Sequence, residues 1–414
     1  MMTASDLGSA SAYRSVPLRR VFRIANGGTP TADADNWDGE IGWFTPEDLS
    51  PRFAEAPDRS RRSLTTRGLA TCSATVGPAG SLVLTARAPI GNLGLLAYPA
   101  AVNQGCRLLI PKPGTFCRYF AYVLEASTGD LRSLGQGSTF QEISSMKLGS
   151  YRVPAPPFHS QRAIADYLDR ETGRIDALVE AKRRLMTLLT ERLSSLVVRL
   201  SVNQYSADGA PTADDFRPSS RSRPAKRLMR KLDRGIRPDD EVVTAFRDGE
   251  VNVRSARRSD GYTFSEIEDQ YQGVEPGDIV FHGLDGFAGA VGTSVARGKC
   301  TPVYHVCEAV NGNDARFVAL TLRTLGVIGF LAAQSGNVRE RSVDFRTWRA
   351  LARVPLPTPE LQVQSAAAVE AINATHTERH LRNLLERQLA LLQEYRQALI
   401  TSVVNGALEI SALG

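Results

Sequence analysis

The sequence predicts an α+β protein made of two similar mixed α/β domains joined by two long helices, which pack as an antiparallel coiled coil. Three observations predict this fold. Each half of the 414-residue chain begins with short apolar strands and glycine-rich turns. Each half then continues into a long segment with a narrow apolar stripe. The motif Arg-Val-Pro introduces both segments, at 152–154 and 353–355, which indicates an internal repeat with a pseudo-two-fold relation.

The first long segment, residues 153–202, reads as one helix. Pro154, Pro156 and Pro157 end the preceding strand, because proline cannot continue a ladder of hydrogen bonds. Ser160 is the expected N-cap, since a hydroxyl accepts from a free backbone N–H. A helix with so thin an apolar stripe needs a second long helix as its partner. The expected seam residues are Leu168, Ile175, Leu178, Leu185, Leu189 and Leu196.

The second long segment, residues 354–406, supplies that partner within the same chain. Arg152-Val153-Pro154 recurs 201 residues later, and Gln161 matches Gln362 at the same offset. Glu191 and Leu196 instead match Glu394 and Leu399 at an offset of 203, which predicts an insertion of two residues between the two sets. The expected seam residues of this helix are Leu381, Leu385, Leu392 and Leu399.

The remaining boundaries follow from changes in composition and from a length that exceeds one ordinary core. We expect a flexible N-terminus at 1–16 and a first domain at 17–152. A linker rich in Ser, Asp, Pro and Arg covers 203–227, and the second domain covers 228–353. A short tail covers 407–414.

Within the first domain, the turn at 26–30 precedes an aromatic strand at 42–44. The stretch 76–97 predicts two strands around a polar turn at 87–92, and a further strand covers 108–110. One amphipathic helix at 116–134 and a glycine-rich loop at 135–140 complete the domain. The second domain repeats this order with a strand at 274–281, a helix at 317–333 and a loop at 334–339.

Net charge, cysteine spacing and the distribution of apolar residues limit the classes of protein to which the chain can belong. The net charge of +6 is compatible with a polyanionic partner and equally with an ordinary arginine-rich surface. The five cysteines form no C-x-x-C pair, so we expect buried thiols in a reducing compartment rather than a zinc site. The first residues do not resemble a signal peptide, and no apolar run reaches the length of a membrane span. We therefore expect a cytoplasmic protein without a membrane partner.

No catalytic signature occurs in an adequate context. The chain has no phosphate-binding G-x-x-x-x-G-K-[ST] loop, no H-E-x-x-H and no G-x-S-x-G. His376 and His380 share a helix face, but without a third ligand nearby they read as a solvated face. Two similar domains with polar, glycine-rich loops suit instead the reading of two separated DNA half-sites.

Several stretches together resemble one family, the specificity subunits of type I restriction–modification systems. They are GGTP at 27–30, LTARAPIG at 84–91, VNQG at 102–105, QGSTFQEIS at 136–144, VPAPPFHSQRAIADYLDRET at 153–172, LLTERLSSLV at 188–197, GDIVFHGLDGFAGAVG at 277–292 and EYRQALITSVVNGALEI at 394–410. They cover nearly the whole chain in the family's order.

The resemblance implies two target recognition domains that read a bipartite, asymmetric site in double-stranded DNA, with the coiled coil setting the spacing. It implies no catalysis and no cofactor on this chain. Two modification subunits would methylate adenine with S-adenosylmethionine, and restriction subunits would add an ATP-driven translocase and a nuclease that use Mg²⁺.

By resemblance and loop position we predict ten DNA contacts, although each of them also suits an ordinary loop residue. They are Thr29, Arg87, Gln104, Gln136 and Ser138 in the first domain, and His282, Arg297, Gln334, Asn337 and Arg339 in the second. Two other functions stay open from the sequence. One is a coiled-coil scaffold that does not bind DNA, and the other is a self-contained DNA methyltransferase or nuclease.

Overall fold

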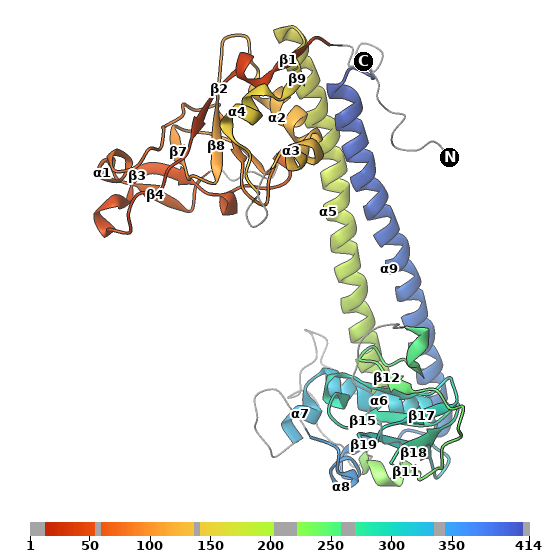
Figure 1. Ribbon diagram of the computed structural model, residues 1–414. Helices are drawn as coiled ribbons and strands as arrows, with labels where there is room; N and C mark the ends of the chain where they lie inside the picture. Colours follow the sequence, from red (N-terminus) through yellow and green to blue (C-terminus); the bar gives the residue numbers. More distant parts are fainter. Residues whose placement is uncertain are drawn as a thin grey trace. The chain divides into compact units, whose positions relative to one another are not determined.

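The computed structural model describes residues 13–53, 59–135, 141–202, 222–257, 270–334 and 344–408, with only the backbone of Gln334. The chain forms two compact units. Unit 1 contains residues 1–181 and 387–414, and unit 2 contains residues 182–386. The long helices α5 (Phe158–Val202) and α9 (Leu361–Val404), both labelled in Figure 1, each contribute one part to each unit.

Unit 1 is a mixed α/β unit built on a four-stranded antiparallel sheet in the order β2-β8-β5-β6. A second sheet has the order β4-β3-β7, and β1 pairs with β9. The strands are β1 (Ser15–Pro17), β2 (Phe22–Asn26), β3 (Trp37–Phe44), β4 (Arg62–Leu64), β5 (Leu82–Thr85), β6 (Leu93–Leu95), β7 (Ala100–Val102), β8 (Cys106–Pro111) and β9 (Arg152–Pro154). The short helices are α1 (Thr66–Ala70), α2 (Cys117–Ala126), α3 (Thr128–Leu134) and α4 (Ser145–Ser150).

Helix α2 links the sheet of unit 1 to the long helices. Phe22 of β2 packs edge-on against Phe120 of α2, with 5.5 Å between ring centroids. The same hydrophobic core includes Leu168 from α5 and Ile400 from α9, both fully buried. Burial of this continuous apolar surface therefore joins the sheet and the two helix segments into one unit.

Unit 2 repeats the four-stranded antiparallel sheet, in the order β11-β18-β15-β16. Three strand pairs accompany it, β10-β19, β12-β13 and β14-β17. The strands are β10 (Ser222–Pro224), β11 (Met229–Lys231), β12 (Val243–Ala245), β13 (Val251–Val253), β14 (Gln272–Val274), β15 (Ile279–His282), β16 (Val291–Thr293), β17 (Gly298–Cys300), β18 (Tyr304–Ala309) and β19 (Pro355–Pro357). Its short helices are α6 (Ala315–Val327), α7 (Phe330–Gln334) and α8 (Trp348–Leu351).

The strand pairs β1-β9 and β10-β19 correct the register of the repeat. Val153 is the buried centre of β9 and pairs with Val16, whereas Leu356 is the buried centre of β19 and pairs with Arg223. The offset is therefore 203 residues here as well, so the predicted match of Arg152-Val153-Pro154 to 353–355 and the predicted insertion are wrong. The Arg-Val-Pro identity misled because burial, and not the proline, sets which residue faces the core.

The same correction applies to Gln161, whose counterpart is Gln364 and not Gln362. Both side chains are buried and each caps a helix of its own unit. The Gln161 side-chain oxygen accepts the N–H of Phe116 before α2 (2.8 Å), and that of Gln364 accepts the N–H of Asp314 before α6 (3.0 Å). Each amide nitrogen donates to the carbonyl of an upstream proline, Pro156 or Pro359.

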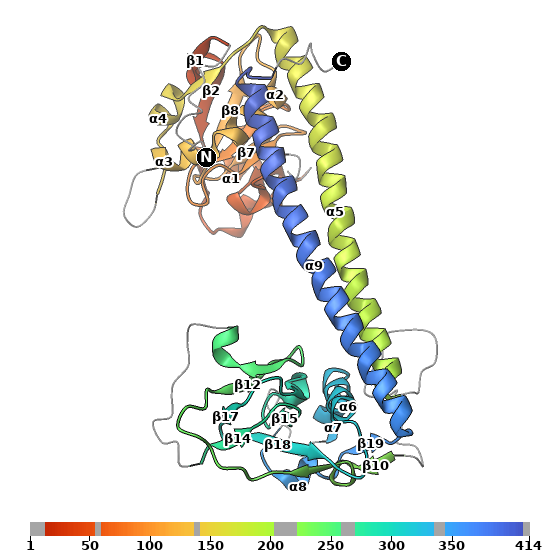
Figure 2. The ribbon, with the colours of Figure 1, turned by 90° about the vertical axis from the view of Figure 1, so that its right-hand side faces the viewer.

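The long helices run antiparallel within each unit. In unit 1 Tyr119 donates to the carbonyls of both Pro154 and Val404, so the start of α5 lies beside the end of α9. In unit 2 the hydroxyl of Thr190 bonds Glu378 at 3.4 Å. There Leu200 packs against Ala367, which places the end of α5 beside the start of α9. The predicted fold class is confirmed, and Figure 2 shows the two helices side by side.

The seam differs from the predicted stripe. Leu168, Ile175, Leu385 and Leu399 are buried, and Leu189, Leu196 and Leu392 are half-buried. Leu178, Leu185 and Leu381 are instead exposed, with 45%, 46% and 38% of their surface accessible. Val179 takes the buried position next to Leu178. The residues that stay on the contact face are separated by seven or fourteen positions within each helix, so one row of the expected heptad packs, whereas the second row, with Leu178, Leu185 and Leu381, does not.

Two predicted helices are each broken into two. The 116–134 helix ends at Ala126, where the hydroxyls of Ser127 and Thr128 bond the carbonyls of Val123 and Glu125 and compete with helix continuation. The 317–333 helix breaks at Gly329, which has a φ of +86°.

Two further boundaries also differ from those expected. Helix α5 begins at Phe158, so Ser160 lies inside the helix and is not its N-cap. The predicted linker at 203–227 contains β10.

Candidate nucleic-acid interface

Three loops of unit 1 converge where β5 ends and β8 begins. The N–H groups of Ala86 and Arg87 both donate to the carbonyl of Gly105, at 2.8 and 3.2 Å. The N–H of Ile143 donates to the carbonyl of Ala86 at 2.9 Å. A Cβ on Gly27 would lie 1.8 Å from the carbonyl oxygen of Asn103, so this approach requires glycine. Backbone hydrogen bonds thus fix the position of loops that are distant in sequence.

Three of the predicted contacts of unit 1 lie on these loops. Thr29 and Gln104 are exposed and hydrogen-bond each other. Arg87 is also exposed, and its Nε donates to Glu142 at 2.8 Å. Gln136 and Ser138 belong to 136–140 and lie outside the described residues. The structure therefore brings Thr29, Arg87 and Gln104 to one loop cluster with donors and acceptors turned toward solvent.

A buried arginine that the sequence reasoning missed supports this cluster. Arg107 of β8 is 6% exposed and donates to Glu142 (2.7 Å) and to the carbonyls of Ile143 (3.2 Å) and Gln104 (3.1 Å). Partial burial would raise the pKa of Glu142, but the hydrogen bonds from Arg107 and Arg87 lower it below its ordinary value. Glu142 is therefore a fixed anion. An arginine inside the strand pattern after VNQG was the signal available in the sequence.

Unit 2 has the same loop framework with different side chains. The N–H of Gly283 donates to the carbonyl of Val303 (2.9 Å), and the N–H of Phe345 donates to the carbonyl of Gly283 (2.8 Å). His305 takes the place of Arg107, with its Nε2 2.7 Å from the carbonyl oxygen of Phe345. Burial lowers the pKa of His305, so a neutral imidazole replaces the charged guanidinium of unit 1.

Among the predicted contacts of unit 2, the side chains of His282 and Arg297 are the two that the structure describes, and they lie in different segments of the chain. His282 ends β15, and its Nδ1 accepts the N–H groups of Leu284 (3.2 Å) and Asp285 (3.0 Å), which shapes the loop. Arg297 lies between β16 and β17, where carboxylates of Asp240 (3.0 Å) and Glu275 (2.8 Å) occupy its guanidinium. Gln334 ends α7 with only its backbone described, and Asn337 and Arg339 lie outside the described residues.

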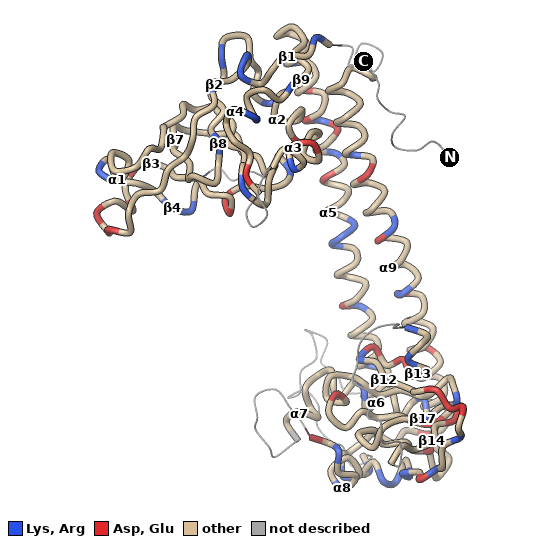
Figure 3. The backbone as a smooth tube through the Cα atoms, viewed as in Figure 1, with Lys and Arg blue, Asp and Glu red and all other residues tan. Residues whose placement is uncertain are grey.

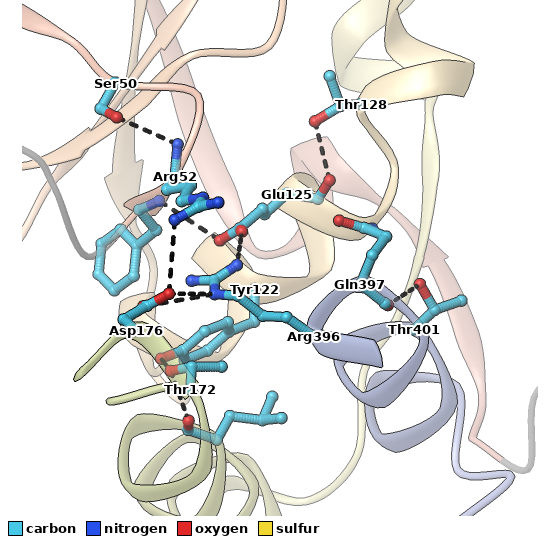
Figure 4. A network of polar contacts seen from close by, with 12 residues as sticks. Ser50, Arg52, Tyr122, Glu125, Thr128, Thr172, Asp176, Arg396, Gln397 and Thr401 are labelled. Atoms are coloured by element: carbon cyan, nitrogen blue, oxygen red, sulfur yellow. Dashed lines mark hydrogen bonds and ion pairs between the residues drawn. The ribbon is translucent and has the colours of Figure 1, made fainter. Parts of the chain in front are cut away.

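A second network that the sequence did not reveal ties unit 1 to its long helices (Figure 4). Arg396 of α9 is 3% exposed and ion-pairs with Glu125 of α2 and with Asp176 of α5 (3.2 Å). The N–H of Phe53 reaches the other oxygen of Glu125, and Arg52 reaches Asp176 at 3.5 Å. Burial alone would lower the pKa of Arg396, but the two carboxylates raise it, so this guanidinium stays charged.

Clusters of metal ligands and cysteine thiols are the reactive groups to consider in the two units. Within the described residues, no group of three or more His, Cys, Asp or Glu could hold a metal ion. Burial raises the pKa of the thiols of Cys106, Cys117, Cys300 and Cys307 to about 12, so none of the four is an activated nucleophile. Basic and acidic residues are interspersed along both units (Figure 3). In the part of the chain that the structure describes, no helix has the length and apolar character of a membrane span.

The residues of unit 1 match a known family. Residues 11–184 match the family described as "Type I restriction modification DNA specificity domain". Over these residues the chain is therefore similar to a type I specificity domain. The match agrees with the family that the sequence motifs resemble.

A curated relative agrees with this assignment. The specificity subunit of the type I restriction enzyme MjaIX from Methanocaldococcus jannaschii is 33% identical over 175 residues. The aligned part covers 42% of this chain and 40% of that relative's own length.

Solved structures show that the specificity-domain fold extends beyond the matched residues. A chain from the study "Structural basis underlying complex assembly and conformational transition of the type I R-M system" aligns with a TM-score of 0.65 at 12% identity, over 96% of this chain and 98% of that one. The HsdS subunit of Thermoanaerobacter tengcongensis aligns with a TM-score of 0.56 at 11% identity, over 96% and 97%. Both likenesses concern the fold.

Proposed function

We propose that this chain is the DNA sequence-recognition subunit of a type I restriction–modification complex and that its two units read the two parts of a bipartite DNA site. The observation that carries the proposal is the matched DNA specificity domain in unit 1, whose sheet and loop framework recurs in unit 2. The exposed Thr29, Gln104 and Arg87 supply hydroxyl, amide and guanidinium groups of the kind that contact phosphates and base edges.

In this proposal the chain itself does not catalyse a reaction. Its partners are double-stranded DNA, two modification subunits and the restriction subunits. S-adenosylmethionine, ATP and Mg²⁺ belong to those subunits. The name of the MjaIX relative and the fold shared with the HsdS subunit support this assignment.

DNA binding by the purified chain with its modification subunits tests the proposal. We expect binding to a duplex library to weaken steeply as salt rises, because arginines that contact phosphates release counterions. Sequencing of methylated adenines in cells that carry the complex should reveal a two-part motif with a gap. The absence of salt-sensitive DNA binding would favour the scaffold alternative, and methylation by the chain alone would favour the self-contained enzyme.

The length of the long helices offers a second test. The chain passes from unit 1 to unit 2 through α5 and returns through α9, and we propose that these helices set the gap in the recognised site. Removing one heptad from each helix shortens both by about 10 Å at 1.5 Å per residue. The methylated motif should keep both halves and lose base pairs from its gap. Altered halves with an unchanged gap would contradict this role.

A further inference from the structure

Both units hold an exposed arginine with a carboxylate at the same place in the loop framework. In unit 1 the carboxylate is Glu142, the residue before Ile143. In unit 2 it is Asp344, the residue before Phe345. Ile143 and Phe345 are equivalent, because each donates its N–H to the first residue after the central strand, Ala86 or Gly283. The arginines come from different loops, so the arrangement is not a consequence of local sequence similarity.

In unit 1 the two oxygens of Glu142 bind different arginines. One oxygen accepts from the buried Arg107 (2.7 Å), which anchors the carboxylate to β8. The other oxygen accepts from Nε of Arg87 (2.8 Å), whose side chain is 45% exposed. Within the described residues, no partner is found for the two terminal amino groups of Arg87. The bond to Glu142 therefore restrains one edge of the Arg87 guanidinium, while the side chain stays partly exposed.

In unit 2 the carboxylate of Asp344 binds both the side chain and the backbone N–H of Arg346. Its oxygens accept from Nε (3.0 Å) and Nη2 (2.7 Å) of Arg346, and one of them also accepts the backbone N–H of Arg346 (2.9 Å). These bonds lower the pKa of Asp344 to about 2, so the pair stays charged. The Arg346 side chain is 59% exposed, and no partner of its Nη1 occurs among the described residues.

Holding an exposed arginine in this way favours one kind of ligand. A free arginine side chain loses rotamer entropy when it is fixed, and a carboxylate that fixes it beforehand removes part of that loss. The carboxylate also repels a phosphate group, because both are anions. It does not repel a neutral base edge. Guanine presents O6 and N7 in the major groove, which match the forked donors of arginine.

Building on the proposed function, we propose that Arg87 and Arg346 each read one guanine, one in each half of the DNA site. Glu142 and Asp344 are positioning residues that act through these arginines. Arg346 is not among the DNA contacts predicted from the sequence. We propose it as the base-reading arginine of unit 2 in place of Arg297, because Asp240 and Glu275 already pair with the Arg297 guanidinium.

The experiment uses the chain assembled with its modification subunits and measures binding to libraries with one half-site randomised. Arg87→Ala should reduce discrimination for guanine at one position of one half-site by about tenfold or more, and Arg346→Ala should do so in the other half-site. Arg87→Lys keeps the charge but not the fork, so it should lose the guanine preference and keep most of the affinity. Glu142→Gln and Asp344→Asn should weaken the same preferences by smaller factors.

Arg230→Ala is the matched control, because Arg230 is an exposed partner of Glu308 on the paired strands β11 and β18, away from the loop framework. It should leave both half-sites unchanged. A uniform loss of affinity for all sequences in Arg87→Ala and Arg346→Ala, with a smaller salt dependence, would indicate phosphate contacts and overturn the inference. Wild-type half-sites without a G·C pair would overturn it as well. If the wild-type complex selects no sequence at all, the proposed function fails instead.

Discussion

In each unit an arginine of α9 forms ion pairs with the rest of the unit, but this arginine is buried in unit 1 and exposed in unit 2. In unit 1 it is Arg396, whose side chain is 4% exposed and pairs with Glu125 and Asp176. In unit 2 it is Arg379, whose side chain is 43% exposed and lies 3.4 and 3.5 Å from Glu250 and Asp248. Arg379 occupies the repeat position of Asp176, so the charge on the helix is reversed between the units.

The comparison shows that the two units share their fold but differ in the ion pairs that stabilise it. Sheet order, loop framework and the capping glutamines Gln161 and Gln364 are shared, so they are the common requirements of the unit. The ion pairs are not shared. A buried ion pair is costly to break because the remaining charge has no water around it, whereas an exposed pair exchanges its partner for solvent. We therefore expect the units to respond differently to similar substitutions.

The largest expected effect comes from Arg396→Ala. Removal of this guanidinium leaves Glu125, which is 5% exposed, without its charged partner. The free energy of unfolding should fall by about 3–5 kcal/mol. Urea unfolding measures the change, and hydrogen exchange of α2 peptides locates it in unit 1. The matched substitution Arg379→Ala should cost no more than about 1 kcal/mol. If both substitutions lower the free energy of unfolding equally, the buried and the exposed ion pairs do not differ as proposed.

The capping glutamines should show the opposite pattern, with similar effects in both units. Gln161→Ala and Gln364→Ala each leave a helix N–H and a proline carbonyl without their partner. Each substitution should lower the free energy of unfolding by about 1–3 kcal/mol. Gln362→Ala is the control, because Gln362 is the exposed residue matched by the wrong register. A larger loss for Gln362→Ala than for Gln364→Ala would refute the corrected offset.

The smallest effect concerns the residue that precedes α6 in unit 2. The carboxylate of this residue, Asp314, accepts the N–H of Arg316 at 2.9 Å, whereas the corresponding residue before α2 is Phe116, whose own side chain cannot accept a hydrogen bond. The hydrogen bond from the Arg316 side chain, together with Ser365, lowers the pKa of Asp314 to about 2. Asp314→Ala should cost about 1 kcal/mol at neutral pH.

The pH dependence of this cap follows from its lowered pKa. A depressed folded pKa stabilises the folded state above the unfolded pKa, near 3.8, and this contribution is lost as pH falls toward about 2. The difference in urea midpoint between the wild type and Asp314→Ala should therefore be constant above about pH 5 and shrink below pH 4. A difference that persists undiminished at pH 2.5 would show that the carboxylate charge contributes nothing to the cap.

The sequence by itself determined the two-unit α+β organisation and the two long helices. Strand alternation, helical periodicity and turn residues are local properties, so they can be read without knowledge of the fold. The sequence identified Thr29, Arg87 and Gln104 only as residues of separate loops, and the tertiary structure brings these loops together. Glu191 and Glu394 indicate the offset of 203 that holds along the helices, but the local identity at Arg152 indicates 201 for their start, and only the strand pairing corrects it.

Only the tertiary structure decided which charged residues are buried and which partners they meet. Glu125 and Arg396 are 271 positions apart, and Arg107 meets Glu142 across 35 positions. No periodicity encodes such pairs, because an isolated Arg or Glu in a helix or strand pattern normally predicts a solvated face. The fold buries these side chains and thereby makes the carboxylates and guanidinium groups hold each other in fixed places. The orientation of Arg87 and Arg346 by Glu142 and Asp344 has the same origin.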